Sequence, residues 1–227
     1  MKWFSKKSTK LLILLLSLDI LILLLHLIFP EKSFFNLDME SNLPTIYQGS
    51  KLILIACVSL VLLFLEYIKV EDMRKNWFWI FWSVMFFFLG VDEIGQIHEN
   101  VSQYMKEIFK NEATSYEAAL LDVGYSSTTW LPYYIFPFIL ATIIVAIALK
   151  KLYRENNKTV WFLIIGWSIF LAVPVIEYLN TMSGIMFQEG YQALVFIEES
   201  LEMFGASFLL SFTLIYLFDS ELLRKTV

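Results

Sequence analysis

The stretch that decides the fold runs from Trp77 to Asn100 and reads "WFWIFWSVMFFFLGVDEIGQIHEN". Its first half is an unbroken apolar run, and its second half adds three carboxylates and one imidazole, from Asp92, Glu93, His98 and Glu99. A charged side chain at bilayer depth costs about 3 kcal/mol, so it usually faces a partner, a cavity or a transport path. The stretch therefore predicts a membrane-spanning helix that carries a polar site.

The rest of the chain is equally apolar. Of its 227 residues, 58% are hydrophobic, and the mean hydropathy is +0.65. A membrane helix needs roughly 20 apolar residues, and six windows meet this need: Leu11–Phe29, Ser50–Val70, Trp77–Ile97, Tyr133–Lys150, Val160–Asn180 and Ala193–Phe218. We predict an all-α polytopic membrane protein with about six transmembrane helices, residues 1–227 forming a single transmembrane helical domain. Its environment is the lipid bilayer. The net charge of −5 says little about partners, because the acids lie partly inside the apolar windows, and no nucleic-acid partner is expected.

The distribution of Lys and Arg predicts the orientation of these helices. Thirteen of the 17 basic residues fall on the flanks that share a side with the N-terminus, and only four fall on the other side, namely Lys32, Lys51, Lys106 and Lys110. Cytoplasmic flanks are enriched in Lys and Arg. Both termini are therefore predicted to be cytoplasmic, in a multi-pass protein of the cell membrane, taken to be the bacterial inner membrane. Trp77, Trp79, Trp82 and Trp161 are expected at the inner interface.

The ionisable groups inside the windows share one depth. At 1.5 Å per residue, Asp92, Glu177, Glu202 and His26 each lie roughly 22–25 Å from the inner end of their helix. On an ideal helix, Asp92 also shares a face with Gln96 and Glu99. We therefore expect these groups to converge in the outer third of the bilayer. Asp19 lies deeper and is expected to be a structural partner of a polar group on another helix.

Two of these helices carry a recognisable pattern. The segments "FLGVDEIGQIHENV" and "IEESLEMFGASFLL" resemble the signature stretches of a group of uncharacterised multipass bacterial membrane proteins, which have an LDE…HE helix and a later EE..LEM.G helix. This chain has Val91 where Leu is usual. The resemblance implies no activity, but it groups the acids of the two helices with His98.

So many carboxylates cannot all be ionised together in a low dielectric without a counter-charge. One resolution is a divalent metal cation, for which oxygen-rich ligands favour Ca²⁺, Mn²⁺, Mg²⁺ or iron, with Zn²⁺ as a further option. The candidate metal ligands are Asp92, Glu93, His98, Glu99, Glu177, Glu198, Glu199, Glu202 and His26.

Three functions are consistent with such a site. The first is metal binding, with metal-activated water hydrolysing a lipid-borne or extracytoplasmic substrate. The second is a proton- or cation-coupled transporter, in which several carboxylates stay protonated. The third is a non-catalytic membrane assembly factor whose acids only hold helices together. No serine triad, HExxH, paired cysteines or phosphate loop is present, so no catalytic residue is assigned.

Overall fold

The computed structural model describes residues 6–39, 41–70, 77–98, 100–101, 104, 131–154, 159–186 and 191–219. These residues form six long helices and one short 3₁₀ helix, in the order α1 (Lys6–Ile28), η1 (Ser33–Phe35), α2 (Leu43–Val70), α3 (Trp77–Gly95), α6 (Leu131–Arg154), α7 (Val160–Met186) and α8 (Tyr191–Asp219). No strand occurs among them. The predicted all-α class is confirmed.

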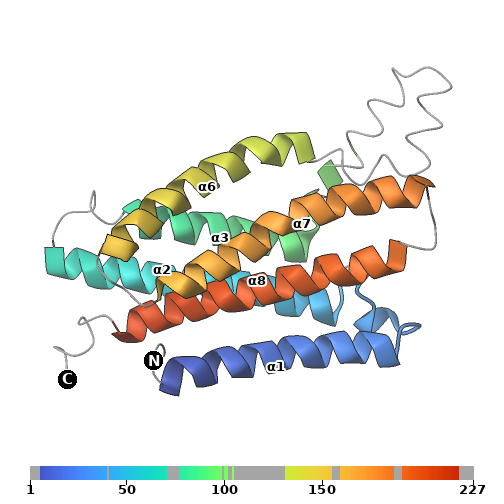
Figure 1. Ribbon diagram of the computed structural model, residues 1–227, viewed down its shortest axis with the longest axis horizontal. Helices are drawn as coiled ribbons and strands as arrows, with labels where there is room; N and C mark the ends of the chain where they lie inside the picture. The colour runs from blue at the N-terminus through green and yellow to red at the C-terminus, as the bar shows by residue number, and fades with distance from the viewer. Residues whose placement is uncertain are drawn as a thin grey trace.

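Five of the helices are long and apolar enough to cross a membrane, over Thr9–Ile28, Leu43–Ile68, Trp77–Gly95, Ile135–Tyr153 and Gln192–Phe218. In α7 the segment Val160–Ile176 is apolar, and the whole helix has 27 residues and runs along the bundle (Figure 1). The chain is therefore a multi-pass membrane protein. The side of the membrane on which its termini lie stays a prediction.

Successive helices run antiparallel, so α1 begins and α8 ends at the same end of the bundle (Figure 1). We call this the inner end. The end at which α1 stops and α2 starts is called the outer end. These names follow the orientation that the basic residues predict.

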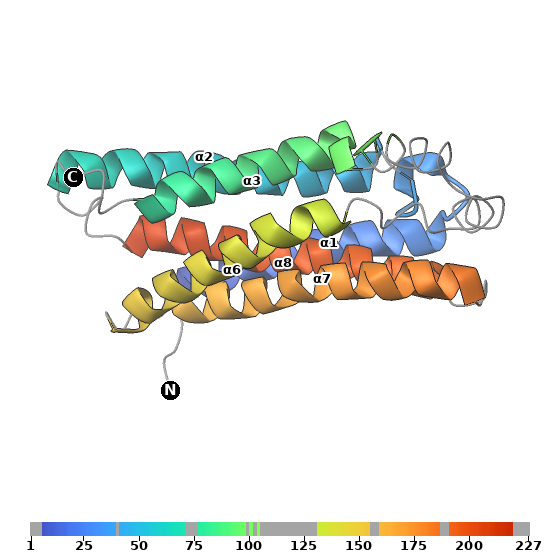
Figure 2. The same ribbon diagram turned by 90° about the horizontal axis from the view of Figure 1, so that it is seen from above.

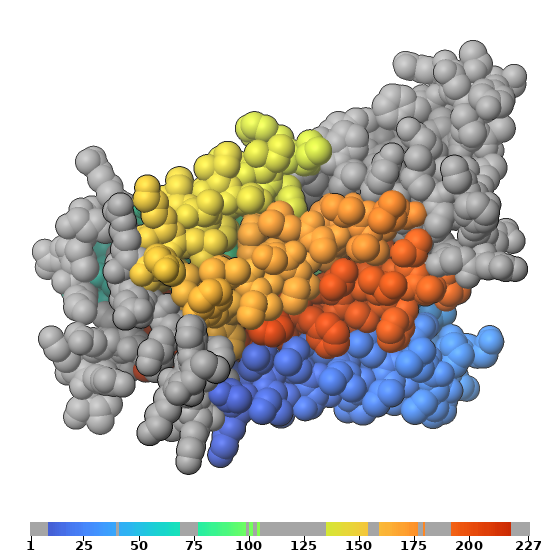
Figure 3. Space-filling view, in the orientation of Figure 1, coloured from blue at the N-terminus to red at the C-terminus, as the bar shows by residue number. Residues whose placement is uncertain are grey.

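Helix α8 is the centre of the bundle. It packs against α1, α2 and α7, while the closest helix pairs are α2 with α3 and α7 with α8. On one face of the molecule, α1, α8, α7 and α6 lie side by side in that order (Figure 3), and α2 with α3 forms a second layer (Figure 2). More than half of the apolar span of α8 is buried, compared with 17% for α1. Helix α1 is therefore a peripheral helix attached mainly to α8.

Glycines allow the two closest helix pairs to form. A Cβ added at Gly90 of α3 would lie 3.0 Å from the Gly49 carbonyl oxygen and 2.7 Å from the Ile53 side chain of α2. Likewise, a Cβ at Gly166 of α7 would lie 2.8 Å from Leu209 of α8. Helix pairs in membranes depend on such close approach, because lipid provides no hydrophobic drive for association.

The four tryptophans predicted near the inner helix ends divide into two exposed and two buried residues. Trp77 and Trp161 are exposed. Trp82 is fully buried and packs at 4.7 Å from Phe86 and 5.9 Å from Trp167, measured between ring centroids. Trp79 is also buried, against Tyr216 of α8, so the face of α3 that carries Trp79 and Trp82 is turned toward the bundle rather than toward lipid.

Candidate functional site

A buried ion pair joins α1 to α2 in the outer half of the bundle. The Lys51 ammonium lies 2.8 Å from Oδ1 of Asp19, and Lys51 and Asp19 are 4% and 0% exposed. Lys51 is about 12 Å along α2 from Leu43, and Asp19 is about 13 Å along α1 from its end at Ile28, at 1.5 Å per residue. Both charges therefore lie well inside the helices.

Every charged atom of this pair has further partners. The hydroxyls of Tyr47 and Ser207 donate to the two Asp19 oxygens at 2.7 and 2.6 Å. The Lys51 ammonium also donates to the Met203 carbonyl at 2.8 Å and lies 4.4 Å from the centre of the Tyr47 ring. We refer to Asp19, Tyr47, Lys51, Ser207 and the Met203 carbonyl as the Lys51 cluster. It links three helices, α1, α2 and α8, through hydrogen bonds to charged groups, which are the strong ones.

The cluster changes two expectations from the sequence. Asp19 was expected to be the partner of a polar group on another helix, and this is confirmed. Lys51, in contrast, was counted with the outer flank at the very start of the window Ser50–Val70, and this was wrong because it lies two turns inside α2. The predicted orientation is unchanged by this correction, since thirteen basic residues then lie on the inner flanks and three on the outer flanks.

Two more carboxylates face the same ammonium. Glu202 of α8 and Glu93 of α3 both act electrostatically on Lys51. Glu93 follows Phe86 by two helical turns, and Glu202 precedes Leu209 by two turns. Since Phe86 and Leu209 are both fully buried, both glutamates lie on inward faces of their helices. One carboxylate therefore contacts the ammonium directly, and two more, on different helices, act on it electrostatically.

Gln48 lies one turn from Lys51 on α2. Its side chain is 1% exposed, and neither its amide nitrogen nor its amide oxygen has a hydrogen-bond partner in the described part of the chain. A buried amide that forms no hydrogen bond costs about 1–3 kcal/mol. Such a group next to a charged cluster is the kind of position where a buried water molecule or a polar ligand binds.

Asp92 pairs with His98 across a break in the helix. Helix α3 ends at Gly95, and Gln96 has a left-handed conformation with φ 54°. After this break the His98 backbone N–H donates to Asp92 Oδ1 at 2.9 Å, and the His98 ring nitrogen Nδ1 lies 3.1 Å from Oδ2. A continuous helix through Ile97 was expected, with His98 turned away from Asp92. This was wrong, because Gln96 ends the helix and Asp92 accepts the N–H that the break exposes.

The left-handed conformation of Gln96 can be tested by substitution. Glycine adopts this conformation without steric cost, whereas a β-branched residue does so with difficulty. We expect Gln96→Val to lower the free energy of unfolding by about 1–3 kcal/mol. Gln96→Gly should match or exceed the wild type, even though it removes the hydrogen bond to Ser41. Unfolding in mixed detergent measures both, and equal losses in the two variants would show that φ at this position is unimportant.

His26 ties the end of α1 to the segment that follows. Its Nδ1 accepts a hydrogen bond from the Leu37 backbone N–H at 3.2 Å, and its ring stacks on Phe196 of α8 at 6.2 Å. A neutral imidazole that accepts at Nδ1 carries its proton on Nε2. In this arrangement neither ring nitrogen has a free lone pair, so metal binding at His26 would require breaking the hydrogen bond to Leu37.

The positions of the other candidate metal ligands are described in less detail. Glu198 and Glu199 are half-buried in the second turn of α8. Glu177 lies within α7, but its side chain and the whole of Glu99 lie outside the described residues. Among the side chains that the structure describes, no three His, Cys, Asp or Glu residues are grouped closely enough to hold a metal ion. The metal set stays a prediction.

A protein-family model described as "Domain of unknown function (DUF8692)" matches residues 11–216. The match includes four of the six long helices completely, most of α1 and α8, and every residue of the Lys51 cluster. The chain belongs to the DUF8692 family. No curated protein and no solved structure matches it.

Sequence reasoning missed Lys51 and Gln48 in this DUF8692 protein because it placed the start of the second helix at Ser50. In the structure α2 begins at Leu43, since the Asn42 side chain caps it by accepting the Thr45 backbone N–H at 3.2 Å. Asn followed three residues later by Thr, with Pro44 in the first turn, is a recognisable helix start. This signal would have placed Lys51 two turns inside the helix.

Proposed function

We propose that this DUF8692 protein is a proton- or cation-coupled membrane transporter in which the Asp19–Lys51 pair is the site that takes up and releases the proton. A single observation carries the proposal. One buried ammonium contacts one carboxylate directly and lies within electrostatic range of two others on different helices. Ionisable groups buried in a membrane protein commonly mark ion pathways and proton relays.

The step we propose is a change of partner. When Asp19 takes a proton, its attraction for the Lys51 ammonium falls, and the carboxylates of Glu93 and Glu202 become the stronger partners of that ammonium. The contacts of Asp19 with Tyr47 of α2 and Ser207 of α8 weaken in the same step. Since α1 packs mainly on α8, protonation would loosen a peripheral helix from the bundle. Two arrangements of one helix, selected by a proton, are what coupled transport requires.

The buried side-chain amide of Gln48 is a second observation that supports the proposal. A relay needs water or another polar group next to the site that takes up the proton, and the Gln48 amide provides two unpartnered hydrogen-bonding atoms one turn from Lys51. A purely structural cluster would gain nothing from such a buried amide. The assembly-factor hypothesis therefore leaves Gln48 unexplained.

Flux measurements test the proposal. Purified protein in liposomes that contain a pH-sensitive dye should move protons under an imposed pH or cation gradient, at a rate above that of empty liposomes. A chelator should leave this flux unchanged, because Lys51 provides the counter-charge. No flux under proton, Na⁺ or K⁺ gradients would refute the transporter proposal.

A divalent metal site is the second candidate, and the Asp92–His98 contact favours it. This contact brings an imidazole nitrogen and a carboxylate together beside Glu93, and these are donor types that Mn²⁺, iron or Zn²⁺ accepts. Metal binding would raise the thermal stability of the folded protein, as any ligand of the native state does. Replacing Asp92 by Asn together with Glu202 by Gln should abolish that gain. A metal-dependent hydrolase acting on a lipid-borne substrate would add turnover that the same double variant lacks.

A further inference from the structure

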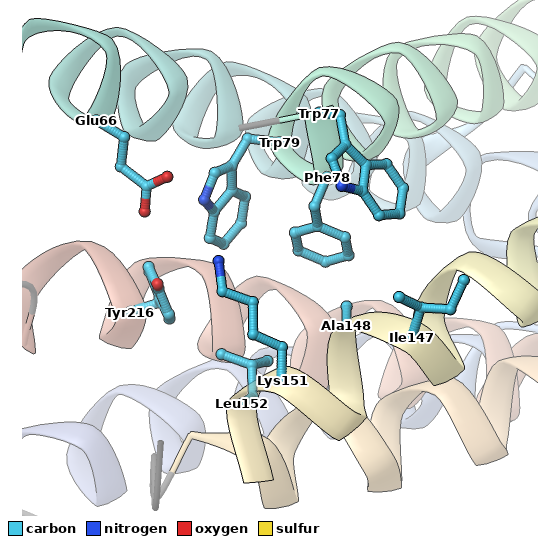
Figure 4. Close-up of a pocket in the computed structure, with 9 residues that line it drawn as sticks. All are labelled: Glu66, Trp77, Phe78, Trp79, Ile147, Ala148, Lys151, Leu152 and Tyr216. Atoms are coloured by element: carbon cyan, nitrogen blue, oxygen red, sulfur yellow. The ribbon is translucent and has the colours of Figure 1, made fainter. Parts of the chain in front are cut away.

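A second polar site lies at the inner end of the bundle, far from the Lys51 cluster. A cavity of about 100 Å³ opens between α2, α3, α6 and α8. Its charged groups are Glu66 of α2 and Lys151 of α6, and its aromatic lining includes Trp77, Trp79 and Tyr216. Figure 4 shows the Lys151 side chain reaching from α6 toward Trp79, with the Glu66 carboxylate turned toward the same opening. We call this cavity the inner pocket.

The inner pocket lies at the depth of lipid headgroups. Trp77 is the first residue of α3, Lys151 is three residues from the end of α6, and Tyr216 is three residues from the end of α8. At 1.5 Å per residue these positions lie within about 5 Å of the helix ends. Tryptophan and tyrosine are enriched at this level of a membrane, where an apolar ring meets polar headgroups.

The aromatic side of the inner pocket is well packed, and the side formed by α6 is open. Trp79 packs on Tyr216 at 4.9 Å and on Phe78 at 5.0 Å between ring centroids, so the aromatic side is a connected unit. Lys151, in contrast, is exposed, and α6 packs mainly on α7 rather than on α3 or α8. A ligand can therefore enter beside α6 without disrupting the aromatic wall.

The charges of the pocket select a zwitterion. An ammonium from Lys151 attracts a phosphate, while the Glu66 carboxylate and the faces of the tryptophan rings attract a cationic amine. A headgroup that carries both a phosphate and a primary amine provides a partner for each of these charges, whereas a purely anionic headgroup would be repelled by Glu66. We propose that the inner pocket binds the headgroup of an aminophospholipid, phosphatidylethanolamine.

Lipid-dependent stability tests the proposal on the full-length protein in detergent. Adding dihexanoyl phosphatidylethanolamine should raise the thermal unfolding temperature by several degrees, and by more than the same concentration of dihexanoyl phosphatidylglycerol. The variant Lys151→Gln should lose most of the response to both lipids. Lys150→Gln is the matched control, since Lys150 is its exposed neighbour and does not line the pocket. Glu66→Gln should keep the response but lose the preference for the amine.

Three results would overturn the proposal. The first is an equal loss of response in Lys150→Gln and Lys151→Gln, and the second is a wild type that does not distinguish the two lipids. The third is free phosphoethanolamine stabilising the protein as well as the lipid does at equal concentration, which would assign the pocket to a soluble ligand. Because each variant changes an exposed or partly exposed side chain, folding should be retained in all of them.

Discussion

Replacing Lys51 by methionine is expected to lower the free energy of unfolding by about 3–5 kcal/mol, the cost of leaving a buried charge without its partner. In this variant Asp19, which is fully buried, would keep two hydroxyl donors but lose its counter-charge. The measurement is unfolding of the purified protein in mixed detergent. Lys32→Met is the control, because Lys32 is exposed in the segment before α2.

The double variant Asp19→Asn with Lys51→Met separates the ion pair from its surroundings. Asparagine can still accept a hydrogen bond from Tyr47 or Ser207, and no unpaired charge is left. Replacing both members of a buried pair by neutral residues is often neutral or stabilising, so we expect most of the lost stability to return. If Lys51→Met were as stable as Lys32→Met, the ion pair would contribute nothing to the free energy of unfolding.

The second large effect is expected at Gly90. Replacing it by alanine places a Cβ 3.0 Å from both the Gly49 carbonyl oxygen and the Ile53 backbone nitrogen. Backbone atoms cannot move aside cheaply, so α2 and α3 must separate. Over-packing of this kind costs about 1–3 kcal/mol. Because α2 carries Lys51 and α3 carries Glu93, the substitution should also disturb the Lys51 cluster.

Gly95→Ala is the matched control for Gly90→Ala. It lies on the same helix, and an added Cβ there would lie 3.6 Å from the Ile97 side chain, an ordinary contact. This variant should unfold within about 0.5 kcal/mol of the wild type, the usual range for a substitution that meets no clash. Equal losses in the two variants would show that the loss at Gly90 does not come from its close contact with α2, since helix propensity alone favours alanine over glycine.

Apolar composition was sufficient to predict the bundle, because a run of apolar residues in a bilayer has few folds other than a helix. It could not predict which face of a helix is buried. Trp79 and Trp82 look like interfacial residues by position along the chain, yet they pack in the core. The inward face of α3 is set by the close contact at Gly90, which only the folded helix pair reveals.

The candidate site was predicted in part. Shared depth indicated α3 and α8 among other helices, and Glu93 and Glu202 on these two helices act electrostatically on one ammonium in the structure. The convergence of the full set of acids stays a prediction. The counter-charge itself was missed, because the start of α2 was placed at Ser50 instead of Leu43. The pairing of His98 with Asp92 was missed for a different reason. It depends on one left-handed residue, Gln96, and no periodicity argument includes such a break.

Proton flux in the neutral double variant tests the central claim most directly. Asp19→Asn with Lys51→Met is expected to fold, so a change in its activity is not a change in its stability. Wild-type protein and the double variant would be reconstituted into liposomes at equal amounts, with thermal unfolding recorded on the same samples. The account predicts proton flux in the wild type and none above empty liposomes in the folded double variant. Equal flux in the two proteins would contradict it.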